Sequence, residues 1–156
     1  MQSTNSHMSQ LFTLPFLLIG ILCHTGINLE SAVAPHSEDE MTKGATLIVE
    51  GKVLSVTSKT EKSKVERGLL VARDRVYSIQ VEVSSVAKGK AKVGEKINFK
   101  AWKPSTRVPP LPGPQGHSSI PKQGDSVKVF LLGDEKSYQP FMPNGIEILK
   151  EAEPKK

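Results

Sequence analysis

Cysteine is almost absent from this chain, since Cys23 is the only one among 156 residues. It directly follows an uncharged apolar run, LFTLPFLLIGIL, at residues 11–22. A run of this length is too short to cross a bilayer as a helix, which needs about 20 residues, but it is typical of the core of a signal peptide. We therefore predict a signal peptide at residues 1–34. Its removal would leave a domain without cysteine, which excludes a disulfide framework and thiol catalysis.

Positive charge is missing from the predicted signal, although a standard signal begins with it. Residues 32–34 have the A-x-A pattern of a cleavage site, but Pro35 follows them directly. Three alternatives stay open: a lipoprotein signal with Cys23 lipidated, a membrane anchor retained through residues 11–23, and a buried apolar segment. After cleavage we expect no integral membrane span and a secreted or periplasmic protein. An exported domain without cysteine favours a bacterial source.

Aromatic residues are also scarce: five Phe, two Tyr and one Trp. Proteins that bind single-stranded nucleic acid interleave aromatic residues with cations on their strands. Here Lys96, Lys100, Trp102 and Lys103 give only a faint version of that pattern. We therefore expect no nucleic-acid partner.

Acidic residues are outnumbered in the predicted mature domain. All 21 Lys and Arg residues follow residue 34, whereas only Glu30 of the 16 acidic residues precedes it, so the exported net charge would be +6. The lysines are spread along the chain, as they are in proteins whose charge serves solubility. An exported basic protein also meets phosphate-rich surfaces, acidic glycans and anionic lipid headgroups.

Catalytic and metal-binding motifs are lacking. Of the four histidines only His117 lies in the predicted domain, in a polar loop where we expect it to be solvated. A zinc site needs three or four ligands, and no such spacing occurs. The residue types of a hydrolase triad are present in Ser118 or Ser119, His117 and Asp125, but no nucleophile elbow accompanies them. We predict a protein that is not an enzyme, with no catalytic residue, no metal and no cofactor.

Strand patterns are what the sequence does contain. Tyr77, Ile79, Val81 and Val83 alternate with polar residues, which indicates a half-buried strand. Gly51 lies in the middle of another apolar stretch, which suggests a bulge or a bend there. No amphipathic helix longer than two turns is visible. The predicted strands are 46–57, 76–86, 96–103, 126–132, 138–142 and 146–149.

This strand order predicts an all-β fold. Five or six short strands with one long connection favour a small OB-like Greek-key barrel over residues 45–150, preceded by the signal segment. The polar residues 35–44 read as a linker, residues 58–68 as a solvated hairpin connection, and residues 151–156 as a disordered tail.

A proline-rich loop is predicted at residues 104–122. Proline cannot donate to a sheet ladder and favours extended backbone, so this loop should be stiff and lose little entropy on binding. Trp102, at its base, either covers the core or stands exposed for stacking. The candidate binding residues are Trp102, Lys103, Arg107, Pro110, Leu111 and His117.

The chain resembles the netrin-like domain family, whose barrel is used by the tissue inhibitors of metalloproteinases. The matching segments are residues 45–56, 77–89, 96–101 and 124–132, with Asn144-Gly145 near the end. The resemblance implies an OB-type barrel. Those inhibitors chelate a protease zinc through an N-terminal cysteine, and here Cys23 would occupy that place only if cleavage followed Leu22. The resemblance therefore supports the fold and not the inhibitory mechanism.

Together these features predict an exported, non-enzymatic β-barrel module that binds a protein, an envelope polysaccharide or another anionic surface. The alternative is a secreted, protease-inhibitor-like protein that acts through the loop 104–122.

Overall fold

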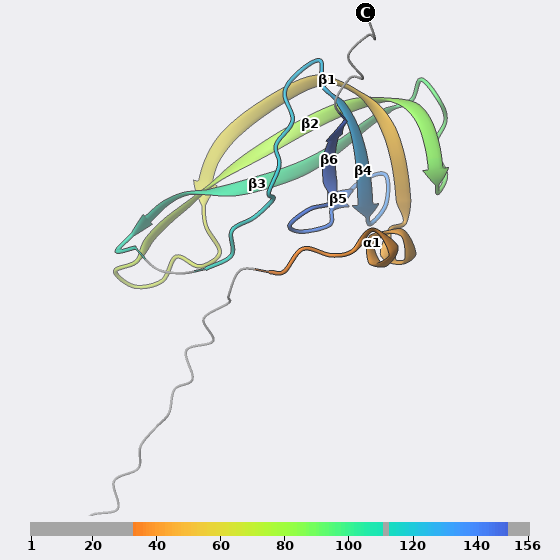
Figure 1. The fold of residues 1–156 in the computed structure, drawn as a ribbon. Helices are drawn as coiled ribbons and strands as arrows, with labels where there is room; N and C mark the ends of the chain where they lie inside the picture. The colour runs from red at the N-terminus through yellow and green to blue at the C-terminus, as the bar shows by residue number, and fades with distance from the viewer. Residues whose placement is uncertain (1–32, 111–112, 150–156) are drawn as a thin grey trace, which may run out of the picture.

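The fold consists of one short helix followed by six strands in a single antiparallel sheet (Figure 1). The computed structural model describes residues 33–110 and 113–149, so residues 1–32 of the predicted signal and the predicted tail lie outside the described residues. The all-β prediction is confirmed. The elements are α1 (Glu38–Gly44), β1 (Leu47–Lys62), β2 (Val71–Lys88), β3 (Lys96–Val108), β4 (Ser126–Leu132), β5 (Gln139–Pro140) and β6 (Ile146–Leu149).

The sheet has the order β3-β2-β1-β4-β5, and β6 also pairs with β4. The three long strands β1, β2 and β3 lie side by side and extend well beyond β4, β5 and β6 (Figure 1). The predictions for 126–132 and 146–149 match β4 and β6, whereas the first three strands are longer than predicted. The charged residues 58–62, interpreted as part of a hairpin connection, belong to β1. Strands β1 and β2 stay paired as far as Lys62 opposite Arg73.

The pairing of β1 is irregular at Gly51, where the sequence suggests a bulge or a bend. Its pairing with β2 shifts in register between Glu50 and Gly51 and at two other places. A Cβ atom at Gly51 would lie 2.3 Å from the carbonyl oxygen of Glu82 and 2.6 Å from Cγ1 of Val81. Only glycine permits this close approach of the two backbones, so the pairing of β1 with β2 at this point depends on it.

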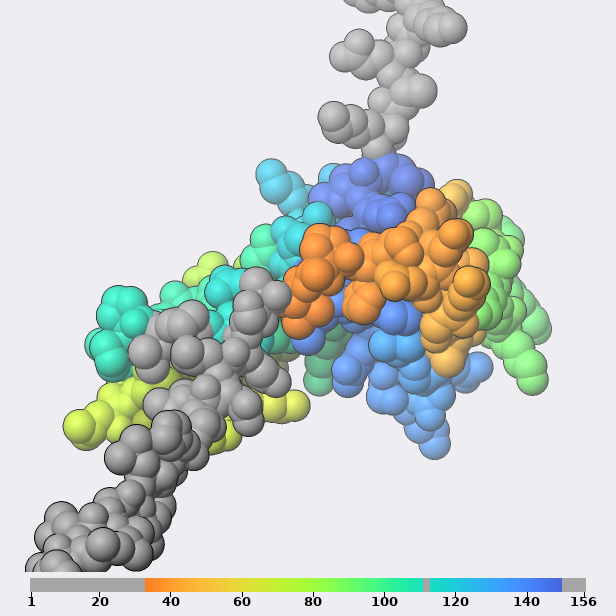
Figure 2. All heavy atoms as spheres, turned by 60° about the horizontal axis from the view of Figure 1, so that its bottom comes forward, coloured from red at the N-terminus to blue at the C-terminus, as the bar shows by residue number. Residues whose placement is uncertain are grey.

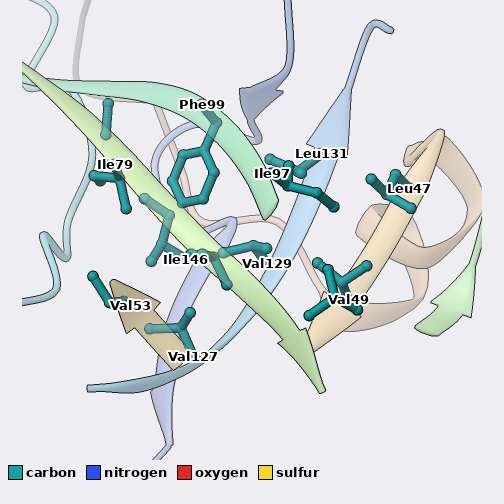
Figure 3. Packing of buried hydrophobic residues seen from close by; sticks show 13 residues of the cluster. Leu47, Val49, Val53, Ile79, Ile97, Phe99, Val127, Val129, Leu131 and Ile146 are labelled. Atoms are coloured by element: carbon teal, nitrogen blue, oxygen red, sulfur yellow. The ribbon is translucent and has the colours of Figure 1, made fainter. Parts of the chain in front are cut away.

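The main hydrophobic core lies on one face of the curved sheet (Figure 3). Five of the six strands contribute to it, and their side chains point toward one another. Burying this apolar surface is the main source of stability in a domain without disulfides. The core residues are Leu47, Val49, Val53, Ile79, Val81, Val83, Ile97, Phe99, Ala101, Val127, Val129, Leu131 and Ile146.

The segment interpreted as a linker, residues 35–44, contains α1. Its start is a capping box, in which the Glu40 N–H donates to Ser37 Oγ (3.3 Å) and the Ser37 N–H donates to Glu40 Oε2 (2.9 Å). Met41 is only 1% exposed and packs in a second cluster with Phe130 of β4. Figure 2 shows α1, in orange, lying against the C-terminal strands, in blue. A single apolar residue in a polar segment was too weak a signal to predict this docking.

The sheet is not closed into a barrel among the described residues. Strands β3 and β5 lie near each other, yet no hydrogen-bonded ladder joins them. Strand β5 has two residues, and one of them, Pro140, has no N–H to donate. Within residues 33–110 and 113–149, no helix is both long enough and apolar enough to cross a membrane.

Candidate functional site

Trp102 of β3 and His117 of the following loop are joined by two hydrogen bonds. The His117 N–H donates to the Trp102 carbonyl oxygen (2.9 Å), and the Trp102 N–H donates to His117 Nδ1 (3.1 Å). On its other side, His117 Nε2 lies 3.4 Å from the carbonyl oxygen of Pro140. His117 therefore bridges the gap between β3 and β5 at one point.

His117 is 4% exposed, so the prediction of a solvated loop histidine is wrong. The reason is the preceding residue: Gly116 has a φ of 71°, and a Cβ there would lie 2.2 Å from the Trp102 carbonyl oxygen. Burial lowers the pKa of His117, against the opposing effect of the nearby carbonyl oxygens of Trp102 and Pro140. The imidazole is therefore neutral near pH 7, with Nδ1 as the acceptor and the proton on Nε2.

Arg107 is an internal anchor and not a free binding residue. Its guanidinium donates to Asp74 Oδ1 (2.7 Å) and to the carbonyl oxygen of Arg73 (2.8 Å). The Arg107 and Asp74 side chains are only 13% and 15% exposed. This pairing exists because β3 continues to Val108 through Pro104, which lies opposite Asp74 beside a register shift. The predicted loop 104–122 therefore begins as a strand.

Lys103 and Ser118 hold the loop after His117 in place. Lys103 Nζ donates to the Ser118 carbonyl oxygen (2.8 Å). The N–H and the hydroxyl of Ser118 both donate to the Pro143 carbonyl oxygen (2.8 Å and 2.9 Å). Residues 117 and 118 are thus held by hydrogen bonds from both β3 and the segment around Pro143.

Apart from Arg107, the predicted binding residues divide into two groups. Trp102, Lys103 and His117 lie together at the gap between β3 and β5, and Trp102 is half-buried there. Pro110 is exposed beyond the end of β3, and Leu111 lies outside the described residues.

A groove of about 1220 Å³ runs beside these residues. Its lining comes from the long strands β1, β2 and β3 and from residues around β5. Consecutive residues of β3, from Asn98 to Trp102, contribute to it, so the groove follows an edge of the sheet and not only one face. Trp102, Arg107 and His117 all take part in the lining.

The free edge of β3 is the feature that the sequence analysis missed. The Val83 N–H donates to the Glu95 carbonyl oxygen, so Glu95 faces β2, whereas both backbone groups of Trp102 face away from β2. Backbone direction alternates along an antiparallel strand, and β3 has no register shift between Lys96 and Trp102. The residues whose N–H and C=O groups face outward are therefore Lys96, Asn98, Lys100 and Trp102.

Within residues 33–110 and 113–149, no group of three His, Cys, Asp or Glu side chains is placed to hold a metal ion. Comparisons of the chain with protein-family models, with curated proteins and with solved structures give no match.

Proposed function

We propose that this chain is an exported, non-enzymatic binding module that holds a protein partner in the groove along β3. The observation that carries this proposal is the groove itself, which has a volume of about 1220 Å³ and runs along the open edge of β3. Small-molecule pockets usually measure roughly 300–1,000 Å³ and are more enclosed. An open groove along a strand fits a segment of polypeptide better than it fits a compact substrate.

The rim of the groove is fixed before any partner arrives. His117 is tied to Trp102 and Pro140, and Arg107 is tied to Asp74. Partners lose less conformational entropy when they bind a surface that is already ordered. The half-buried Trp102 offers an aromatic anchor of the kind that is enriched at protein interfaces.

The finer fold assignment belongs to the same proposal. Strand β1 pairs with both β2 and β4, β4 pairs with β5 and β6, and β3 lies near β5. We infer an OB-like barrel that is left open between β3 and β5. The resemblance to netrin-like domains agrees with this inference and adds no mechanism.

The partner is tested by capture from an envelope extract with the tagged, exported form of the protein. Replacing Trp102 with Ala should reduce the captured partner at least tenfold. The control is Leu69→Ala, at an exposed residue (97%) in the turn between β1 and β2, which should capture as the wild type does. Equal capture by the Trp102→Ala protein, with an unchanged melting temperature, would contradict the assignment of the groove.

Export is tested separately, through the intact mass and the N-terminal residue of the protein recovered from cells. A mature chain that begins at Pro35 supports the signal peptide. A lipidated Cys23, or a chain that keeps residues 11–23, would replace the secreted form with an anchored one.

The second candidate is protease inhibition through the loop 104–122. It is favoured by the exposed segment Val108-Pro109-Pro110, which begins at the last residue of β3. Incubation with a panel of secreted proteases tests it, and the absence of inhibition at micromolar concentration counts against it.

A further inference from the structure

We propose that the partner binds as an additional extended strand along the free edge of β3, and that the binding segment is acidic. This inference rests on the proposed function, since it names how a polypeptide would occupy the groove. It makes the backbone of β3, and not only Trp102, the recognition element.

The first support is a row of unused backbone groups. The N–H and C=O groups of Lys96, Asn98 and Lys100 face away from β2, by the alternation that Glu95 and Trp102 establish at the two ends. No residue in the described part of the chain bonds to these groups. An unpaired row of this kind is a template for another strand.

The second support is that the molecule already uses this edge. His117 bonds to both outward backbone groups of Trp102, with its N–H on the carbonyl oxygen and its side-chain Nδ1 on the N–H, where an added strand would place an N–H and a C=O. Two residues further along, Pro104 has no N–H to offer. The vacant part of the edge is therefore bounded and extends from Lys96 to Lys100, next to the groove.

The third support is charge. Strand β3 carries Lys96, Lys100, Lys103 and Arg107 and no acidic residue. Arg107 is paired with Asp74, whereas Lys96 and Lys100 have no ion pair within the described ranges. A second copy of the chain, paired edge to edge, would bring lysines near one another, which is unfavourable. The occupant is thus a different polypeptide with carboxylates near Lys96 and Lys100.

The faces of β3 define the pattern of this occupant. Lys96, Asn98 and Lys100 are exposed on one face, while Phe99 and Ala101 are buried on the other. An added strand continues both faces of the sheet. Its residues should therefore alternate between acidic side chains on the lysine face and apolar side chains on the core face.

The test uses a blocked decapeptide of alternating glutamate and valine as the probe. Trp102 is the only tryptophan, so its fluorescence reports binding at this edge. Two further peptides are N-methylated, one on every glutamate and the other on every valine. All N–H groups of one residue type face the same side of a strand, so one methylated peptide should bind at least tenfold more weakly while the other binds as the parent does.

A matched pair of protein variants tests the same contact from the other side. Asn98→Pro removes an outward N–H that no described residue uses, at a type of position where proline is tolerated. It should weaken binding of the alternating peptide at least tenfold, and Asn98→Ala, which keeps the N–H, should change binding less than threefold. Slowed hydrogen exchange at the amides of Lys96, Asn98 and Lys100 in the complex would support the proposal further.

The outcomes separate the two proposals. Equal binding of both methylated peptides would overturn strand addition and indicate attraction to the lysines alone. No binding of the alternating peptide would also overturn strand addition. The proposed function would still stand in that case if the Trp102→Ala protein captured less partner than the wild type. If full-length partner capture is insensitive to Trp102→Ala, the proposed function itself fails.

Discussion

The two ends of the long strands are held together by different forces. At one end, β1, β2 and β3 pack with β4 and β6 around the apolar core. At the other end, beyond Val56 of β1, the same strands continue with largely polar or exposed side chains. Because β1 and β2 stay paired as far as Lys62 opposite Arg73, the end of the apolar pattern does not mark the end of a strand, and polar contacts can extend a sheet past its core.

Polar contacts at this distal end centre on Glu66 and Asp74. The Glu66 carboxylate pairs with Arg73 and with Lys62 (3.4 Å) and accepts the Ala72 N–H (3.0 Å). Asp74 pairs with Arg107 across the β2–β3 ladder. These bonds tie the distal parts of β2 and β3 to each other and to the turn between β1 and β2, and Arg107 and Trp102 both line the groove.

The largest expected effect lies at the core end. Phe130→Ala should lower the free energy of unfolding by about 3–5 kcal/mol, because it leaves a cavity among Met41, Ile48 and Ala45. Urea unfolding followed by circular dichroism measures this. A loss below about 1 kcal/mol would mean that α1 and β4 do not form a packed core.

A smaller effect is expected at the distal end. Asp74→Ala should cost about 1.5–3 kcal/mol, since it removes a charged hydrogen bond and leaves the largely buried Arg107 guanidinium without that partner. Amides of β1 beyond Thr57 should exchange faster in this variant, while those of the core end keep their protection. Uniformly faster exchange along all three strands would contradict the division into two ends.

The pH dependence of stability tests the junction between the two ends. Burial lowers the pKa of His117 below its usual 6.5, so the unfolded state binds its proton more readily than the folded state does. Stability from this group is complete above about pH 6.5 and falls as the pH drops toward the folded pKa, by up to about 1.4 kcal/mol per pH unit. Unfolding curves between pH 7 and 5 should show this slope, and His117→Gln should remove it. An equal slope in that variant would assign the dependence to other groups.

The smallest effect is expected at the exposed turn. Leu69→Ala should change the free energy of unfolding by less than about 0.5 kcal/mol, because the side chain is 97% exposed and packs against nothing. A larger change would mean that the turn at residues 63–70 stabilises the distal end through contacts other than those of Glu66.

Much of the fold could be predicted from local patterns. The alternation of Ile79, Val81 and Val83 with polar residues identified the buried face of β2, and β4 and β6 lie where the sequence placed them. The length of β3 could not be predicted in this way, because it depends on Arg107 reaching Asp74, 33 residues earlier in the chain.

The sequence by itself determined the strand faces and pointed to the irregularity at Gly51, because these properties depend on residue types within a few positions. Only the tertiary structure decided which strand keeps a free edge and that His117 is buried beside Trp102. Both outcomes depend on contacts between distant segments: β1 takes β4 as its second neighbour, and the two residues of β5 are too few to cover β3. Local sequence patterns do not indicate contacts between distant segments. Those contacts are what leave the candidate binding edge of β3 free.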